Sequence, residues 1–253
     1  MNARCITRSL TPSYRKRLSD STAKRHVRIR PHLAAQERGF AIHPGVLTGR
    51  EIESLVSSLD GVTRSRAGVR HLMSDPRVAD VASDPRLLSL ATALLGSRVV
   101  PYRATLFDKS PTANWLVVWH QDTALPLERR REVAGWGPWS TKAGVTYAHA
   151  PRTALEQIVA LRVHLDDSTA ENGPLRAIPG SHRLGVLSDA AIHEIVARQR
   201  PDECTVERGG VLAMRPLLVH SSSKSTVPLP RRVLHLEYAS MMDFGPDLKL
   251  RVA

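Results

Sequence analysis

Five short β-rich runs between Gly96 and Ala239 constrain the fold of this 253-residue chain more than any other feature. Pro, Gly and Ser turns separate these runs, which are RVVPYRATLFD, WLVVWH, QIVALRVHLD, GVLAMRPLLVH and RRVLHLEYA. Many short strands joined by frequent turns are typical of antiparallel barrels and jelly rolls. The sequence therefore predicts a mainly β domain, to which a few flanking helices are added.

Local capping signals predict where those helices begin. Thr48 and Glu51 have the spacing of a capping box and precede an apolar stripe of helical period. Asp75-Pro76 and Asp84-Pro85 each place a capping carboxylate before a first-turn proline. A further helix is expected within the β region, in SDAAIHEIVARQRP, with Ser188 or the residue after it as its cap.

The positive charge of the chain is concentrated at its N-terminus. The first 33 residues contain nine Lys or Arg and one acid, so they account for 8 of the 12 net positive charges. We expect residues 1–35 to form a basic, disordered tail and residues 36–253 to form one domain. A transit peptide is an alternative, because the segment is rich in Arg and Ser and poor in acids. Nucleic-acid binding is not expected, since Tyr14 is the only aromatic residue among these charges.

Composition also bounds the environment of the protein. No apolar run approaches the length that spans a membrane, and no secretory signal follows the first residue. Cys5 and Cys204 are too few for a disulfide framework and have no CxxC spacing. We expect a reduced, cytoplasmic protein without a membrane partner. The sequence does not indicate an oligomeric state.

The stretch WHQDTALPL raises the question of a metal site. Its His120 and Asp122 follow an apolar run and stand two positions apart, a spacing that places both side chains on one face of a strand. Non-haem Fe(II) oxygenases hold their metal with two His and one carboxylate on one side, which leaves other positions open. His220, at the end of the apolar run LLV, could supply the second imidazole from a distant strand.

A second His-x-Asp pair competes with the first. His164 and Asp166 in RVHLDD have the same spacing, and their alternative interpretation is a polar strand face that lines a cavity or meets solvent. Arg231, eleven residues after His220, favours the first pair. A guanidinium binds a carboxylate through two charge-assisted hydrogen bonds, as a dicarboxylate cosubstrate requires. The alternative for Arg231 is a surface arginine at the start of a strand.

Several motifs, taken in order, resemble the phytanoyl-CoA dioxygenase family. They are GFAIHPGVL, TLFDKSP, WHQD, NGPLRAIPGSHR, GGVLAMRPLLVHSSSKS and RRVLHLEY, and they span residues 36–240. The resemblance implies a double-stranded β-helix, that is, a cupin-like jelly roll. It also implies an Fe(II)- and 2-oxoglutarate-dependent dioxygenase. Such an enzyme would use O2 to hydroxylate a small-molecule substrate and release succinate and CO2.

The same resemblance assigns roles to individual residues. It implies three iron ligands that form the catalytic centre: His120, Asp122 and His220. Arg231 would bind the far carboxylate of 2-oxoglutarate, Ser222 would add a hydrogen bond, and Thr105 would line the cosubstrate pocket. Some relatives carry an aromatic residue at the position of Arg162, which leaves the role of this arginine open.

A long connection between residues 126 and 152 is expected to act as a lid. Loops of this length inside a compact domain are often functional. Trp136 and Trp139 are the candidate substrate contacts, and the alternative is that they pin the loop as hydrophobic anchors. Three consecutive arginines at 129–131 could meet an anionic substrate or solvate the loop.

Other functions remain open at this stage. A cupin-like metal enzyme that does not use 2-oxoglutarate would keep the ligands but would not need Arg231. A non-enzymatic metal- or nucleic-acid-binding module is an alternative of another class. Desaturation or ring closure would use the same ligands as hydroxylation. Related halogenases leave the carboxylate position vacant for chloride, and Asp122 occupies it here. The sequence does not identify the substrate.

Overall fold

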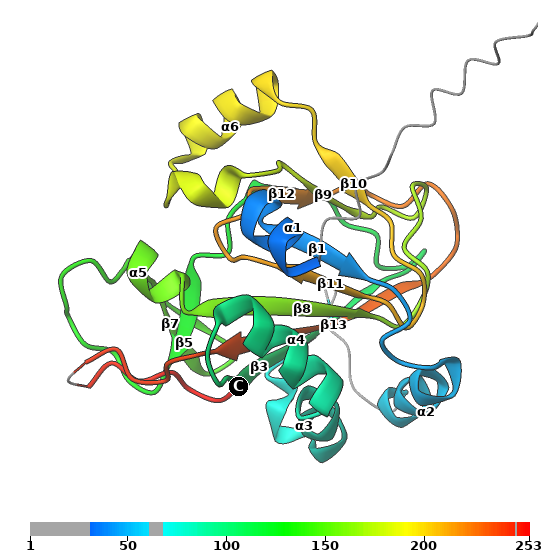
Figure 1. Cartoon of the computed structure of the whole chain (residues 1–253), viewed down its shortest axis with the longest axis horizontal. Helices are drawn as coiled ribbons and strands as arrows, with labels where there is room; N and C mark the ends of the chain where they lie inside the picture. Colours follow the sequence, from blue (N-terminus) through cyan, green and yellow to red (C-terminus); the bar gives the residue numbers. More distant parts are fainter. Residues whose placement is uncertain (1–30, 61–67, 246) are drawn as a thin grey trace, which may run out of the picture.

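The computed structural model describes residues 31–60, 68–245 and 247–253 (Figure 1). The predicted basic tail therefore falls mainly on residues outside the described part of the chain, as does Cys5. Helix α1 (Pro31–Arg38) begins before residue 36, where we placed the start of the domain. The division into tail and domain stays a prediction. Among the described residues, no helix is both long enough and apolar enough to cross a membrane.

Two antiparallel sheets form the double-stranded β-helix, and this confirms the predicted fold class (Figure 1). The larger sheet has the strand order β1 (Phe40–His43), β11 (Val211–Met214), β8 (Ile158–His164), β13 (Arg231–Ala239), β3 (Val100–Lys109) and β2 (Val69–Arg70). The smaller sheet has the order β10 (Asp202–Cys204), β9 (Leu175–Ala177), β12 (His220–Ser222) and β4 (Val117–His120). All five β-rich runs of the sequence contribute strands to these sheets.

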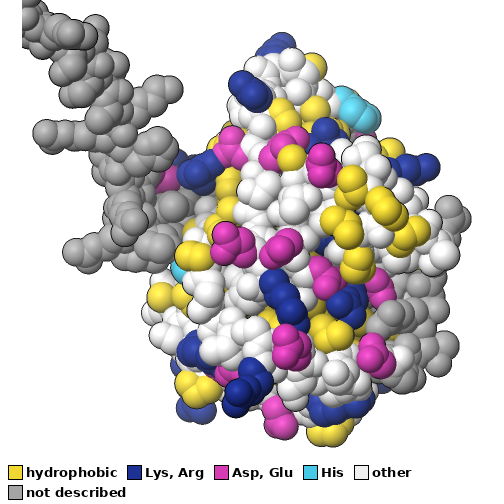
Figure 2. All heavy atoms as spheres, turned by 90° about the vertical axis from the view of Figure 1, so that its right-hand side faces the viewer, with side chains coloured by type: hydrophobic (Ala, Val, Ile, Leu, Met, Phe, Trp, Pro, Cys, Tyr) yellow, Lys and Arg dark blue, Asp and Glu magenta, His cyan; other side chains and the backbone are white. Residues whose placement is uncertain are grey.

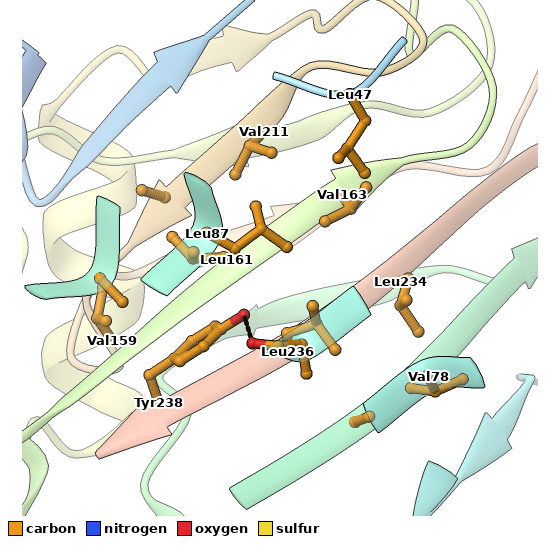
Figure 3. Packing of buried hydrophobic residues seen from close by; sticks show 14 of the residues in the cluster. Leu47, Val78, Leu87, Val159, Leu161, Val163, Val211, Leu234, Leu236 and Tyr238 are labelled. Atoms are coloured by element: carbon orange, nitrogen blue, oxygen red, sulfur yellow. Dashed lines mark hydrogen bonds between the residues drawn. The ribbon is translucent and has the colours of Figure 1, made fainter. Parts of the chain in front are cut away.

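Side chains along each strand of the large sheet alternate between its two faces. Leu234 and Leu236 of β13 and Leu161 of β8 are buried in one hydrophobic cluster (Figure 3). The residues between them on the same strands point to the opposite face, as a strand requires. Tyr238 belongs to the hydrophobic face, and its hydroxyl donates a hydrogen bond of 2.9 Å to the carbonyl oxygen of Ala82 (Figure 3). One face of the sheet is therefore the core, and the other is available for chemistry.

Helices cover the hydrophobic face of the sheet. Leu87 of α4 and Val78 of α3 contribute to the same cluster as the strands (Figure 3). The helices after α1 in the described part of the chain are α2 (Gly49–Leu59), α3 (Pro76–Ala82), α4 (Pro85–Leu95), α5 (Arg152–Leu155) and α6 (Asp189–Arg198). Two short 3-10 helices are η1 (Leu72–Ser74) and η2 (Ser181–Leu184). Thr48 forms the predicted capping box of α2, and Asp75, Asp84 and Ser188 accept backbone hydrogen bonds as predicted caps.

The connection between residues 126 and 152 differs from the expected irregular lid. Part of it belongs to a third sheet of three strands, β5 (Ala124–Leu127), β7 (Val145–His149) and β6 (Trp139–Lys142). Ala143 and Gly144 join β6 to β7 with φ angles of +47° and +77°. Positive φ at both central residues is what the tightest hairpin turns require. The irregular loop is therefore shorter than expected and covers residues 128–138, because this turn pairs two short strands that lack a strong apolar pattern. Its role as a lid stays a prediction.

Charge on the described surface is mixed where Figure 2 shows it. Basic and acidic side chains are interspersed on this face, and apolar side chains lie between them (Figure 2).

Candidate metal centre

His120 and His220 meet because their strands are neighbours. His120 ends β4, His220 begins β12, and the two residues are directly paired across the antiparallel ladder. Their ring centroids are 4.3 Å apart. Pairing across a ladder brings side chains on one face within contact distance. The fold thus joins two histidines that are 100 positions apart in the sequence.

The backbone fixes the orientation of both imidazoles. His120 Nδ1 lies 2.8 Å from the carbonyl oxygen of Val118, and His220 Nδ1 lies 2.8 Å from that of Leu218. A carbonyl oxygen can only accept, so Nδ1 carries the hydrogen in both rings. Each Nε2 then keeps its lone pair, which is the arrangement of metal-binding histidines.

Asp122 completes a group of three. Its carboxylate oxygens lie 3.6 Å from His120 Nε2 and 3.6 Å from His220 Nε2. Its backbone N–H donates to the carbonyl of Pro216 at 2.9 Å, which fixes the chain just after β4. The potential ligand atoms of the three residues all lie within 4.8 Å of one another, and no other such group of three occurs in the described part of the chain.

The electrostatics of this group fit a divalent cation. Burial lowers the pKa of His220 to about 4, so its imidazole is neutral and able to donate a lone pair. Burial alone would raise the pKa of Asp122, but the neighbouring His220 and His120 outweigh it and hold that pKa well below its usual range. Burial would lower the pKa of His120, but the hydrogen bond and charge of Asp122 outweigh it and raise that pKa, so a metal would displace a proton there. Two imidazoles and one carboxylate form a donor set suited to iron(II).

The competing pair His164 and Asp166 is not assembled into a site. Asp166 forms an ion pair with Arg232, with 2.7 Å between an oxygen and Nη2. His164 is buried, and neither of its ring nitrogens has a hydrogen-bond partner. Burial lowers the pKa of His164 to about 3, so it is neutral. The structure thus separates the two His-x-Asp motifs, which their identical spacing could not do.

Arg231 lies on the inner face of the large sheet, at the first position of β13. It is 4% exposed, and it donates to the carbonyl of Asn172 and to Ser222 Oγ at 3.3 Å each. Ser222 Oγ also accepts a hydrogen bond of 3.0 Å from Lys109 Nζ and donates one of 2.8 Å to the carbonyl of Gly173. One hydroxyl thus anchors two buried cations.

Neither of these two cations has a carboxylate partner among the residues that the structure describes. Burial, with Arg231 and Arg162 nearby, lowers the pKa of Lys109 to about 7. Burial and Arg162 likewise lower the pKa of Arg231 to about 9. Buried charges are normally paired. This end of the site is therefore prepared for an anion.

The structure connects polar residues of the cavity wall in a chain that the sequence did not predict. Arg162 Nη1 lies 3.2 Å from His235 Nδ1, and His235 Nε2 lies 3.0 Å from Glu237 Oε1. Glu237 also pairs with Arg103 at 3.2 Å and accepts a hydrogen bond of 2.9 Å from the hydroxyl of Tyr102. Alternation along RRVLHLEY and PYRATLFD was the available signal, because it places Arg103, His235 and Glu237 on the face opposite the core.

The remaining predicted residues divide into two groups. Thr105 lines the cavity, and its hydroxyl is buried without a hydrogen-bond partner. Trp136 and Trp139 are not among the cavity-lining residues. They pack on a separate hydrophobic cluster, where the ring of Trp136 lies 5.6 Å from that of Phe244. Contact of either tryptophan with a substrate stays a prediction.

One cavity of about 380 Å³ contains the three candidate ligands and the polar residues around them. Its charged lining residues, apart from Asp122, are Arg70, Arg103, Lys142, Arg162, Arg231 and Glu237. The volume is in the usual range for small-molecule sites. The cavity can hold a cosubstrate beside a metal, together with a second small molecule.

A known family and several known proteins match most of this chain. The profile of the family described as "Phytanoyl-CoA dioxygenase (PhyH)" matches residues 56–233. The chain is 27% identical to L-proline trans-4-hydroxylase of Streptomyces griseoviridis over 240 residues, 79% of this chain and 82% of that protein. It is 23% identical to ectoine dioxygenase of Halomonas elongata over 236 residues, 78% of this chain and 65% of that protein.

Solved structures show the same fold at low sequence identity. EctD from S. alaskensis with 2-oxoglutarate and 5-hydroxyectoine superposes with a TM-score of 0.64 at 20% identity, covering 88% of this chain and 79% of that one. The epimerase SnoN in complex with Fe3+, alpha ketoglutarate and nogalamycin RO has a TM-score of 0.65 at 17% identity, covering 88% of this chain and 94% of that one.

Proposed function

This chain belongs to the phytanoyl-CoA dioxygenase family, and from that premise we propose how its residues carry out iron(II)- and 2-oxoglutarate-dependent hydroxylation of a small polar molecule. The named relatives support this kind of substrate, because one is a proline hydroxylase and the other an ectoine dioxygenase. The observation that carries the proposal is a single cavity. Two oriented histidines, an aspartate and Arg231 line it, and Lys109 lies behind Ser222; within the described residues neither cation pairs with a carboxylate.

The metal would be held by His120, Asp122 and His220. The potential ligand atoms of these residues lie within 4.8 Å of one another, and all three residues line the cavity. Hydrogen bonds from Nδ1 to the backbone keep both imidazoles in the ligating tautomer. His220 is 5% exposed, whereas the side chains of His120 and Asp122 are 36% and 37% exposed, so the group is accessible from the side of β4.

The distal carboxylate of 2-oxoglutarate would be bound by Arg231. Its guanidinium has five N–H donors, and the two hydrogen bonds to Asn172 and Ser222 leave donors free for a carboxylate. Lys109 would add a second positive charge from behind Ser222. Gly173 supports this corner, because a Cβ atom there would meet the carbonyl oxygen of Ser223 at 2.3 Å.

When bound, iron(II) and 2-oxoglutarate supply the oxidative chemistry, in which O2 is consumed, 2-oxoglutarate becomes succinate and CO2, and the substrate gains a hydroxyl group. The protein positions the reactants and limits access of water. Arg162 and His235 hold each other in place beneath the site, and Glu237 holds His235 from the other side. These contacts fix the polar side chains of the cavity wall, and the Glu237 carboxylate is itself paired with Arg103.

Two measurements test the proposal. Purified protein loaded anaerobically with Fe(II) should bind 2-oxoglutarate with appearance of a metal-to-ligand charge-transfer band. With O2 and a panel of amino acids and other small polar molecules, it should release succinate in equal amount to hydroxylated product. Iron binding without any response to 2-oxoglutarate would favour the cupin-like alternative.

A further inference from the structure

The end of the cavity away from Arg231 is also cationic. Along β13, Arg231 is paired with Lys109 of β3, and Glu237 is paired with Arg103. Six residues of strand separate these positions, a distance of ~20 Å. A five-carbon cosubstrate held at Arg231 cannot extend to Arg103. The cationic groups at this second end therefore require an explanation of their own.

Three cations form this end of the cavity. Arg103 and Lys142 lie against the ring of Tyr147, with 5.2 Å from Arg103 Cζ and 5.0 Å from Lys142 Nζ to the ring centroid. Arg70 comes from the edge strand β2, where it is paired with Thr105. All three line the cavity that contains the candidate ligands. Three separate strands, β2, β3 and β6, thus bring positive charge to one place.

Of these three cations, Arg103 pairs with an acid, namely Glu237. Within the described ranges, Arg70 and Lys142 form no ion pair with a carboxylate. Burial, followed by the charges of Arg70 and Arg103, lowers the pKa of Lys142. The three cations therefore lie close enough to repel one another, and an anion between them would relieve that repulsion.

The charge balance of the whole cavity leads to the same conclusion. Its lining carries five Lys or Arg side chains and two carboxylates, which leaves three positive charges. Iron(II) and the 2-oxoglutarate dianion cancel each other, so loading the site does not remove this excess. Sites of one sign attract and orient ligands of the opposite sign. The molecule that enters after 2-oxoglutarate should therefore be anionic.

We propose that Arg70 and Lys142, with Arg103 beside them, bind the carboxylate of the substrate. This inference rests on the proposed function and adds the chemical class of its substrate, a small carboxylic acid of amino-acid size. The planar guanidinium of Arg70 suits a carboxylate, which it can bind through two hydrogen bonds. The cavity of about 380 Å³ must also contain 2-oxoglutarate, so the acid is small. Anchoring it at this end directs the rest of the molecule toward the candidate metal ligands.

The test uses matched acids and amides on the iron- and 2-oxoglutarate-loaded enzyme. Succinate release is measured with the common amino acids, L-proline included, each compared with its primary amide. Ethanolamine phosphate supplies an anionic group without a carboxylate. We expect at least one amino acid to raise succinate release, and its amide to be about 100-fold less effective in kcat/KM. No stimulation by any amino acid, equal stimulation by acid and amide, or a larger response to the phosphate would overturn the proposal.

A pair of double variants locates the effect. Arg70→Gln with Lys142→Gln should raise the KM of the active acid about 100-fold, since each hydrogen bond to a charged group contributes roughly a factor of ten. The KM of the amide should change little. Arg129→Gln with Arg131→Gln removes the same charge from residues that pair with Asp247 outside the cavity, and it should leave both KM values unchanged. An unchanged KM in the first variant contradicts the assignment.

Anaerobic titration with 2-oxoglutarate separates two kinds of failure. If Arg70→Gln with Lys142→Gln retains the charge-transfer band of the parent, its fold and cosubstrate site are intact, and a negative substrate result concerns only the carboxylate site. If the parent protein itself shows no 2-oxoglutarate binding, the proposed function fails before this inference is reached.

Discussion

Replacing Arg231 by Ala tests the cosubstrate site directly. Arg231 is 4% exposed and contacts only neutral groups, so a bound carboxylate would be its sole ionic partner among the described residues. Removing one partner of a buried charge pair costs about 2–5 kcal/mol. Lys109 Nζ bonds the same Ser222 hydroxyl and stays in the variant, so the loss should lie near the lower limit.

The lower part of that range predicts a measurable change in affinity. A loss of about 2–3 kcal/mol corresponds to a 2-oxoglutarate Kd raised roughly 30- to 150-fold. Removing Lys109 as well should bring the loss toward about 5 kcal/mol, because no cation would then remain beside Ser222. Arg231→Lys should recover part of the affinity, since an ammonium keeps the charge but lacks the fork.

Arg232→Ala is the matched control for this experiment. Its side chain leaves the opposite face of β13 and forms an ion pair with Asp166, away from the cavity. The assay is anaerobic titration of 2-oxoglutarate into each Fe(II)-loaded protein, followed through the charge-transfer band. Loss of affinity in Arg232→Ala together with wild-type affinity in Arg231→Ala would refute our assignment of the two strand faces. An unchanged Kd in both variants would refute the 2-oxoglutarate site.

Three further predictions follow from the same contacts. His220→Ala should abolish iron binding and His164→Ala should retain it, as metal analysis after gel filtration will show; the reverse result would favour the other His-x-Asp motif. Because the pKa of Lys109 is about 7 in the free protein and an adjacent anion raises it, 2-oxoglutarate affinity should be greatest below pH 7 and fall by up to about tenfold per unit above it. Lys109→Met should remove this slope in titrations across pH 6–9, and a slope that persists would assign the proton to another group. Tyr238→Phe should lower the free energy of unfolding in urea by about 1–2 kcal/mol, because the buried carbonyl of Ala82 loses its donor, while an unchanged midpoint would mean that water or relaxation replaces it.

The candidate metal site was predictable because its signals are local. His120 and Asp122 lie together at the end of one predicted strand, and His220 follows an apolar run. The sequence alone therefore placed each of these side chains at or near the end of a strand. What the sequence lacked was the pairing of β4 with β12, a contact between residues 100 positions apart. That pairing also separates this motif from His164 and Asp166, whose spacing is identical.

The residues that sequence reasoning missed are those whose role depends on three-dimensional neighbours. Lys109 is an ordinary lysine in TLFDKSP until β13 and the Ser222 hydroxyl are placed beside it. Arg103 and Glu237 form an ion pair across two strands, and no spacing in the sequence predicts which acid meets which base. The hairpin of β6 and β7 was missed because its two-residue turn was taken for part of a loop.

The alternation along β13 and β3 affects how this enzyme could be redesigned. Residues such as Arg103 and His235 face the cavity, whereas their neighbours Ala104 and Leu236 face the core. Catalytic specificity and folding stability are thus assigned to different positions of the same strands. A combinatorial library confined to cavity-facing positions can vary substrate preference while each clone keeps its core. A single-residue insertion in either strand would exchange the two sets of side chains and destroy both properties together.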